Sequence, residues 1–110
     1  MGHRLAPRAK ADLEDLAFYV FVESGSLEAA NRLVDSITER FVLLGTHPRA
    51  GRRRDDLRPG IRSFAVGNYL VLYRIEGDDV VVQRVVRGSR DIDALFRGQK
   101  DEDGPKTPDK

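Results

Sequence analysis

Apolar residues in the first half of the chain recur with the 3.6-residue period of two amphipathic helices. The first stripe consists of Leu13, Leu16, Ala17, Val20 and Phe21, and the second of Ala30, Leu33, Val34, Ile37, Phe41 and Leu44. Pro7 suits the opening turn of the first helix, and Pro48 closes the second. Between them, Gly25 can end one helix and Ser26 can cap the next. Two helices joined by so short a turn should pack antiparallel as a hairpin.

The second half of the chain changes to the shorter period of β-strands. The predicted strands are residues 61–66, 69–75 and 80–86, with a short first strand at residues 3–6. Gly67-Asn68 is a two-residue hairpin signal, and residues 76–79 form a polar turn. We therefore predict an α+β domain in which the helical hairpin packs on a small antiparallel sheet.

Three further segments have no place in that core. Residues 49–60 lack periodicity and predict a loop, at a length where a functional role becomes a common explanation. Residues 91–96 predict a short helix, and residues 98–110 predict a disordered polar tail. We assign residues 1–97 to a single domain.

Pairing the strands across their turns divides the sheet residues between two faces. One face collects Phe64, Val66, Tyr69, Val71, Tyr73, Ile75, Val80, Val82 and Val86, with Arg62 and Arg84 toward its rim. The other collects Ile61, Ala65, Leu70, Leu72, Val81 and Val85, with Ser63, Arg74, Gln83 and Arg87. The first face is more apolar and should receive the helices. The second needs a cover as well, either the segment around Phe96 or a partner chain.

Composition and charge limit the kinds of functional site that the chain can form. The chain has 110 residues, no cysteine and two histidines, which excludes disulfides and thiolate metal sites and disfavours a histidine metal site. No apolar run has the roughly 18 to 20 residues that span a bilayer, so no membrane partner is expected. The net charge of +1 hides an asymmetry, because residues 1–46 sum to −2 and residues 47–97 to +4. All eleven basic residues in 47–97 are arginines, which favours bidentate carboxylate or phosphate contacts.

No enzyme signature stands out in the chain. The glycines are scattered, and no glycine-rich turn joins a strand to a helix as a nucleotide cradle requires. The carboxylate pairs Asp55-Asp56 and Asp78-Asp79 lie in predicted turns, where turn chemistry explains them. We therefore expect no cofactor, and the arginines remain as the candidate functional residues. A balance of +4 beside seven acids is weak support for direct nucleic-acid binding.

The order of elements and several stretches resemble the ParE branch of the RelE/ParE toxins, the toxic halves of bacterial type II toxin–antitoxin modules. The matching stretches are residues 5–16 (LAPRAKADLEDL), 47–52 (HPRAGR), 54–64 (RDDLRPGIRSF), 66–74 (VGNYLVLYR) and 84–92 (RVVRGSRDI). The resemblance covers roughly residues 4–97. It implies a cytoplasmic protein that inhibits growth.

The resemblance implies one of two mechanisms. RelE-like members cleave mRNA on the ribosome with a basic cluster and a terminal tyrosine or histidine that transfers a proton. Arg62 and Arg90 loosely match two basic positions of that branch. However, no tyrosine or histidine follows Tyr73, and a phenyl ring at Phe96 cannot exchange a proton. ParE-like members inhibit DNA gyrase without catalysis, and the chain follows their pattern. The alternatives are a RelE-like endoribonuclease and an antitoxin-binding relic without toxicity.

The resemblance also implies a ParD-like antitoxin, whose C-terminal segment lies along the helical hairpin and adds extended chain near the sheet. An acidic, apolar segment would suit the second sheet face. The expected antitoxin contacts are Leu70, Leu72, Arg74, Val81, Val85 and Arg87. The expected target contacts are Arg58, Arg62, Arg84 and Arg90.

Overall fold

The predicted helical hairpin is present in the computed structural model, which describes residues 2–88. Helix α1 spans Pro7–Ser24 and helix α2 spans Leu27–Thr46. The connection between them uses the cap residues that the sequence indicates. Gly25 ends α1 in the left-handed conformation, with φ of 70°. The side chain of Ser26 then accepts a hydrogen bond of 3.0 Å from the N–H of Ala29, which caps α2.

Within residues 2–88 the sheet has five strands and is mixed rather than wholly antiparallel. The strands are β1 (Gly2–Leu5), β2 (Arg52–Arg53), β3 (Arg62–Val66), β4 (Tyr69–Glu76) and β5 (Asp79–Arg87). Their order in the sheet is β1-β5-β4-β3-β2. From β2 to β5, each strand pairs antiparallel with the next strand in the chain. The difference from the prediction comes from β1, which pairs parallel with β5, the last strand in the chain order. The helical hairpin carries the chain from β1 to β2 at the opposite edge of the sheet, and the strands then return toward β1. The stretch predicted as a bare loop contains β2 and a short 3-10 helix, η1 (Pro48–Ala50).

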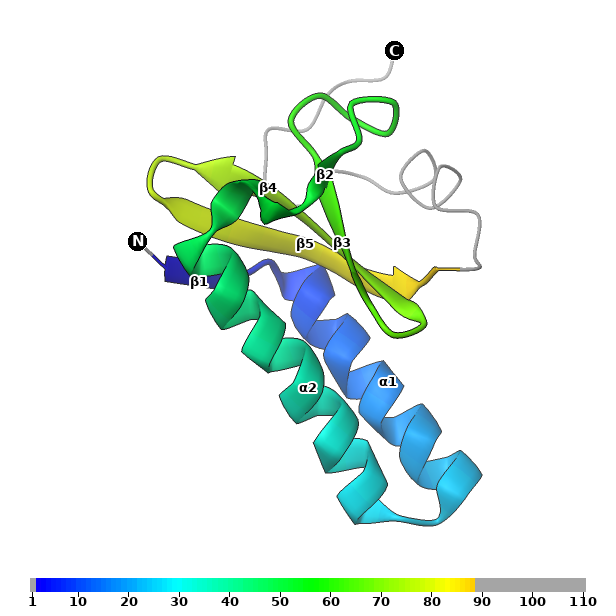
Figure 1. Ribbon diagram of the computed structural model, residues 1–110. Coiled ribbons are helices and arrows are strands. Elements are labelled where there is room, and N and C mark those ends of the chain that lie inside the picture. The colour runs from blue at the N-terminus through cyan, green and yellow to red at the C-terminus, as the bar shows by residue number, and fades with distance from the viewer. Residues whose placement is uncertain (1, 89–110) are drawn as a thin grey trace.

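Both helices cover one face of the sheet, and their connecting turn lies well beyond it (Figure 1). Buried side chains from α1, α2, β3, β4 and β5 form the main core between the two layers. Its members are Ala9, Leu16, Ile37, Phe41, Leu44, Val66, Val71, Tyr73, Val80, Val82 and Val85. A smaller cluster lies on the opposite face and consists of Ile61, Leu72 and Val86, with Leu57 and Leu70 packed against it. The α+β architecture predicted from the two periodicities is therefore confirmed.

An irregularity in the β4–β5 ladder overturns part of the predicted face assignment. Tyr73 pairs with Val82, whereas Leu72 pairs with Arg84, so Gln83 is an extra residue in β5. One inserted residue reverses every later position in a strand whose side chains alternate. Val85 consequently lies in the main core and Val86 in the smaller cluster, the opposite of the predicted arrangement. Arg87, predicted on the second face, lies on the helical side, where its guanidinium is 5.6 Å from the Tyr19 ring centroid.

Several predictions fall outside the described residues. They concern the helix at residues 91–96, the tail at residues 98–110, the domain boundary at residue 97, Arg90 and Phe96. Among the residues that the structure describes, no helix is both long enough and apolar enough to cross a membrane.

Candidate functional site

Arg84, an expected target contact, is buried in an ion pair that joins β5 to α1. Its Nε lies 2.8 Å from Oδ2 of Asp12, and its Nη2 lies 3.1 Å from Oδ1. The Asp12 carboxylate also accepts a hydrogen bond of 2.8 Å from the N–H of Val85. The two side chains are only 9% and 14% exposed. A partner would reach Arg84 only by displacing Asp12, so the geometry gives this arginine a structural role.

Arg62, the second expected target contact, holds the segment after α2 against the sheet. Its Nη1 donates a hydrogen bond of 2.7 Å to the carbonyl of Gly51. The hydroxyl of Tyr73 works at the same place, because it donates to the carbonyl of Pro48 at 2.7 Å and accepts from the N–H of Gly51 at 2.8 Å. We call this set of contacts the Tyr73 latch. A Cβ added at Gly51 would lie 2.8 Å from the carbonyl oxygen of Ser63, so only glycine fits there.

Burial raises the pKa of the Tyr73 phenol, although the hydrogen bond from Gly51 acts in the opposite direction. The hydroxyl therefore stays protonated and keeps its role as a donor. The sequence predicted Tyr73 as a core residue, which is confirmed, but gave no signal for the latch. The general rule that a buried tyrosine hydroxyl needs a partner was the only available hint.

The arginine-rich loop between β2 and β3 is organised by ion pairs between close neighbours. Arg53 contacts Asp55 at 2.7 Å, and Arg54 contacts Asp56 at 3.0 Å. The carboxylate of Asp55 also accepts a hydrogen bond of 2.9 Å from the N–H of Gly60, which closes the loop. That hydrogen bond, with the Arg53 guanidinium beside it, holds the pKa of Asp55 below its ordinary range. Asp55 and Asp56 thus stabilise the turn through ion pairs and a backbone hydrogen bond, as predicted.

Arg58, in the same loop, is half-buried. Of the four expected target contacts, three lie in the described residues, and the structure does not gather Arg58, Arg62 and Arg84 into one cluster. Arg62 contacts Gly51, whereas Arg84 contacts Asp12. Their role in target binding stays a prediction.

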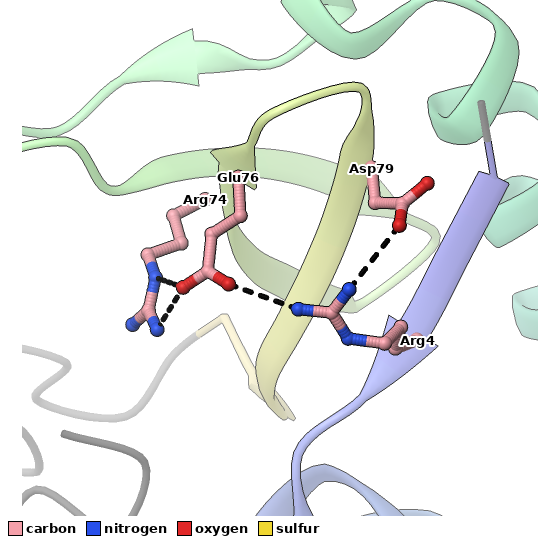
Figure 2. A network of polar contacts seen from close by, with 4 residues as sticks. All are labelled: Arg4, Arg74, Glu76 and Asp79. Carbon is pink, nitrogen blue, oxygen red and sulfur yellow. Dashed lines mark hydrogen bonds and ion pairs between the residues drawn. The ribbon is translucent and has the colours of Figure 1, made fainter.

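A second group of charges links β1, β4 and β5 (Figure 2). Arg4 contacts Glu76 at 2.9 Å and Asp79 at 3.2 Å, and Arg74 also pairs with Glu76. The two guanidiniums, Arg74 first, lower the pKa of Glu76. Arg74, an expected antitoxin contact, is therefore engaged with a carboxylate of its own chain, and an acidic partner would compete with Glu76 for it.

The other expected antitoxin contacts differ in accessibility. Leu72 is 0% exposed, Val85 3% and Val81 5%, so none of the three offers a surface to a partner. Leu70 is half-buried and Arg87 is exposed. These two lie together along a groove of about 450 Å³ at the turn between β3 and β4. A second groove, of about 380 Å³, runs between α1 and β5, and Arg87 and Tyr69 line both grooves.

Large apolar side chains are exposed on the helices, which the periodicity did not predict. The exposed residues are Phe18 (68%), Leu27 (63%), Val42 (61%), Val22 (57%), Tyr19 (48%), Phe21 (43%) and Leu43 (37%). Phe21 was predicted in the buried stripe, but its side chain is 43% exposed. A signal was present, since Phe18 and Val22 fall off the stripe of α1. Such a surface is typical of a protein-binding site.

The described residues include no group of three or more His, Asp or Glu side chains arranged to hold a metal ion. The candidate binding features are three surfaces: the exposed helical residues, the two grooves that share Arg87, and the outer edge of β3. Within residues 2–88, β2 pairs only with Arg62 and Ser63, so residues 64–66 have no strand on their outer side.

Comparisons with known proteins agree with the fold and with the resemblance in sequence. Residues 4–92 match the family described as the ParE toxin of the type II toxin–antitoxin system parDE. Toxin ParE3 of Caulobacter vibrioides is 36% identical over 94 residues, which cover 86% of this chain and 94% of that protein. Toxin RelE3 of the same bacterium is 35% identical, over 74% of this chain and 87% of that protein.

Solved structures give the same result. The chromosomal ParDE system from P. aeruginosa includes a chain with a TM-score of 0.70 and 25% identity, covering 79% of this chain and 95% of that one. The toxin–antitoxin complex RelBE2 from Mycobacterium tuberculosis gives a TM-score of 0.56 and 28% identity, covering 78% and 95%. The predicted family is confirmed: the chain belongs to the ParE toxins of type II toxin–antitoxin systems, within the RelE/ParE superfamily.

Proposed function

We propose that this toxin acts without catalysis, by binding and inhibiting DNA gyrase in the cytoplasm. The observation that carries the proposal is the engagement of Arg62, which loosely matches a basic position of the ribonuclease branch. Its guanidinium donates to the carbonyl of Gly51 within the Tyr73 latch and so serves the fold. The sequence after Tyr73 also has no tyrosine or histidine to exchange a proton with RNA. What remains is a protein whose helices expose large apolar side chains, as a binding protein would.

Induction of the chain in a bacterial host tests the mechanism. We expect growth arrest with SOS induction and DNA breaks, because a blocked gyrase leaves cleaved DNA. Primer extension on cellular mRNA from the same cultures is the matched readout. Discrete, codon-phased cleavage without SOS induction would contradict the proposal.

We also propose that a ParD-like antitoxin neutralises the toxin. The similar P. aeruginosa structure is a ParDE system, and the surface of this chain offers two places for a partner segment. Residues 64–66 can accept an added strand, since main-chain groups at a sheet edge pair readily with extended chain. Val42 and Leu43, on the side of α2 away from the core, can receive an apolar helix.

Arg87 is the accessible cation that we place in the antitoxin interface. It lines both grooves and is exposed, so an acidic side chain of the partner can reach it. Calorimetry with the protein encoded by an adjacent short reading frame should show weaker binding for Arg87→Glu than for the wild type. Arg32→Glu, on the exposed side of α2, is the control and should bind as the wild type does. Equal affinities for all three proteins would remove Arg87 from the interface.

A RelE-like ribonuclease is the second candidate, because the similar proteins include toxin RelE3 and the RelBE2 complex. In that mechanism arginines alone would stabilise the transition state, without the usual gain from proton transfer. The primer-extension experiment decides between the two activities. A chain that neither arrests growth nor cleaves mRNA would be an antitoxin-binding relic.

A further inference from the structure

The solvent side of α1 carries an apolar patch that the core does not use. Successive residues in a helix are about 100° apart, which places Phe18 about 180° around α1 from the fully buried Ala9. Val22 follows Phe18 by one turn and lies on the same side. The two side chains are 68% and 57% exposed. Because they contact neither the sheet nor the groove that contains Tyr19, their removal should not disturb the fold.

Acidic residues accompany this patch. Glu14 and Asp15 are exposed and precede Phe18 by four and three residues, which places them one turn away on the same side of α1. From Ala11 to Ser24 the helix carries four acids and no base, whereas residues 47–97 sum to +4. One of the four acids, Asp12, is neutralised by Arg84. The outer side of α1 is thus apolar and negative on a molecule whose sheet half is positive.

This charge identifies the kind of partner. Two copies of the chain meeting through this side would bring Glu14 and Asp15 of one copy against the same acids of the other, and like charges oppose that contact. An acidic antitoxin segment would be repelled in the same way. A protein surface with apolar residues and basic neighbours would complement both features.

We propose that the outer side of α1, with Phe18 and Val22 as apolar anchors and Glu14 and Asp15 as charged contacts, is the surface that binds the toxin's cellular target. The proposal rests on the proposed function, in which the toxin acts by binding a protein. The two apolar anchors line neither of the grooves that Arg87 borders, whereas Asp15 lies at the edge of the groove between α1 and β5. The arginines first expected to contact the target are not part of this surface.

The test uses the full chain carrying Phe18→Ser together with Val22→Ser. Both residues are exposed, so circular dichroism and thermal unfolding should match the wild type. Inhibition of supercoiling by purified gyrase should weaken about tenfold or more, because a few large apolar side chains supply most of the binding free energy of a protein interface. Growth arrest on induction should weaken in parallel.

Matched variants separate this surface from general effects of a polar substitution. Val22→Ser alone is compared with Val42→Ser, since these two valines are 57% and 61% exposed on different helices. Only the first should weaken gyrase inhibition. Glu14→Lys with Asp15→Lys should also weaken it, whereas Glu39→Lys, exposed on α2, should not.

The outcomes distinguish the two proposals. If the wild type arrests growth without inhibiting gyrase, the gyrase proposal fails, and growth arrest then tests the surface: loss in the Phe18/Val22 variant supports it. If the folded variant retains full inhibition or full growth arrest, the surface proposal is overturned. If the wild type is inactive in both assays, there is no target to bind, and both proposals fail.

Discussion

At the scale of residues, the arginines that looked most available for a partner are largely occupied by the fold. Arg84 and Arg62 were expected to face a target, and both hold segments of the chain together through short, well-formed contacts. The sequence could not show this, because the partners of Arg84 and Arg62 are distant in the chain and belong to other elements. Arginine is suited to either role, since its planar fork binds carboxylates and carbonyls alike.

The pair formed by Asp12 and Arg84 should be a major determinant of stability. Asp12→Ala removes the carboxylate that satisfies a buried guanidinium and the N–H of Val85. We expect a loss of about 3 kcal/mol in the free energy of unfolding, measured by urea denaturation. Asp15→Ala, an exposed neighbour in α1, should change it by less than about 0.5 kcal/mol. Equal small losses for both variants would show that the ion pair does not hold α1.

The Tyr73 latch makes a separate prediction. Tyr73→Phe leaves the buried N–H of Gly51 without its acceptor and should cost about 1–3 kcal/mol. Tyr69→Phe is the control and should be nearly neutral.

The same variant should change the pH dependence of stability. Because burial raises the pKa of Tyr73 above its ordinary value of 10.0, its protonated form contributes stability that is present below pH 10. That contribution is lost as the pH rises through the higher folded value. The wild type should therefore lose stability above pH 10 more steeply than Tyr73→Phe does, when both are followed by urea denaturation. The same pH dependence of the free energy of unfolding in both proteins would contradict a raised pKa for Tyr73.

At the scale of elements, periodicity predicted the hairpin, its caps and the three long strands, since each depends on local residue order. Features that depend on tertiary pairing were missed, including β2 in the predicted loop, the parallel β1 and the irregularity in β5. The sequence does not show that β1 pairs with β5, because the two strands are far apart in the chain. The extra residue Gln83 interrupts an alternation of apolar and polar residues that looks unbroken in the sequence. The missed extra residue put Val85 and Arg87 on the face away from the helices, whereas both lie on the helical side. Val85 is therefore buried in the core, whereas Arg87 is exposed beside α1 and stays a predicted antitoxin contact.

The loop between β2 and β3 offers a test by titration. The carboxylate of Asp55 holds the N–H of Gly60, and its pKa lies below the ordinary value of 3.8. The ionised form therefore stabilises the loop above that value, and the contact is lost as the pH falls through the lower folded value. The amide resonance of Gly60, followed by NMR, should shift with a midpoint below 3.8. Arg53→Ala should raise the midpoint, and a wild-type midpoint at or above 3.8 would contradict the contact.

At the scale of the whole molecule, charge and apolar exposure differ between the outer side of α1 and the sheet half of the chain. The outer side of α1 is apolar and acidic, whereas the sheet half is rich in arginine. A toxin that must be neutralised by one protein and must bind another benefits from surfaces of opposite charge, because each repels the wrong partner. This division also fits a protein that blocks an enzyme by contact rather than by cutting a nucleic acid.

The central claim is that this ParE-family toxin inhibits gyrase by binding, and a supercoiling assay with purified gyrase and the wild-type chain tests it most directly. We expect supercoiling to fall as the ratio of toxin to gyrase rises and to reach a plateau, because a binding inhibitor acts in proportion to the complexes formed. Full supercoiling activity in the presence of excess folded toxin would contradict the account.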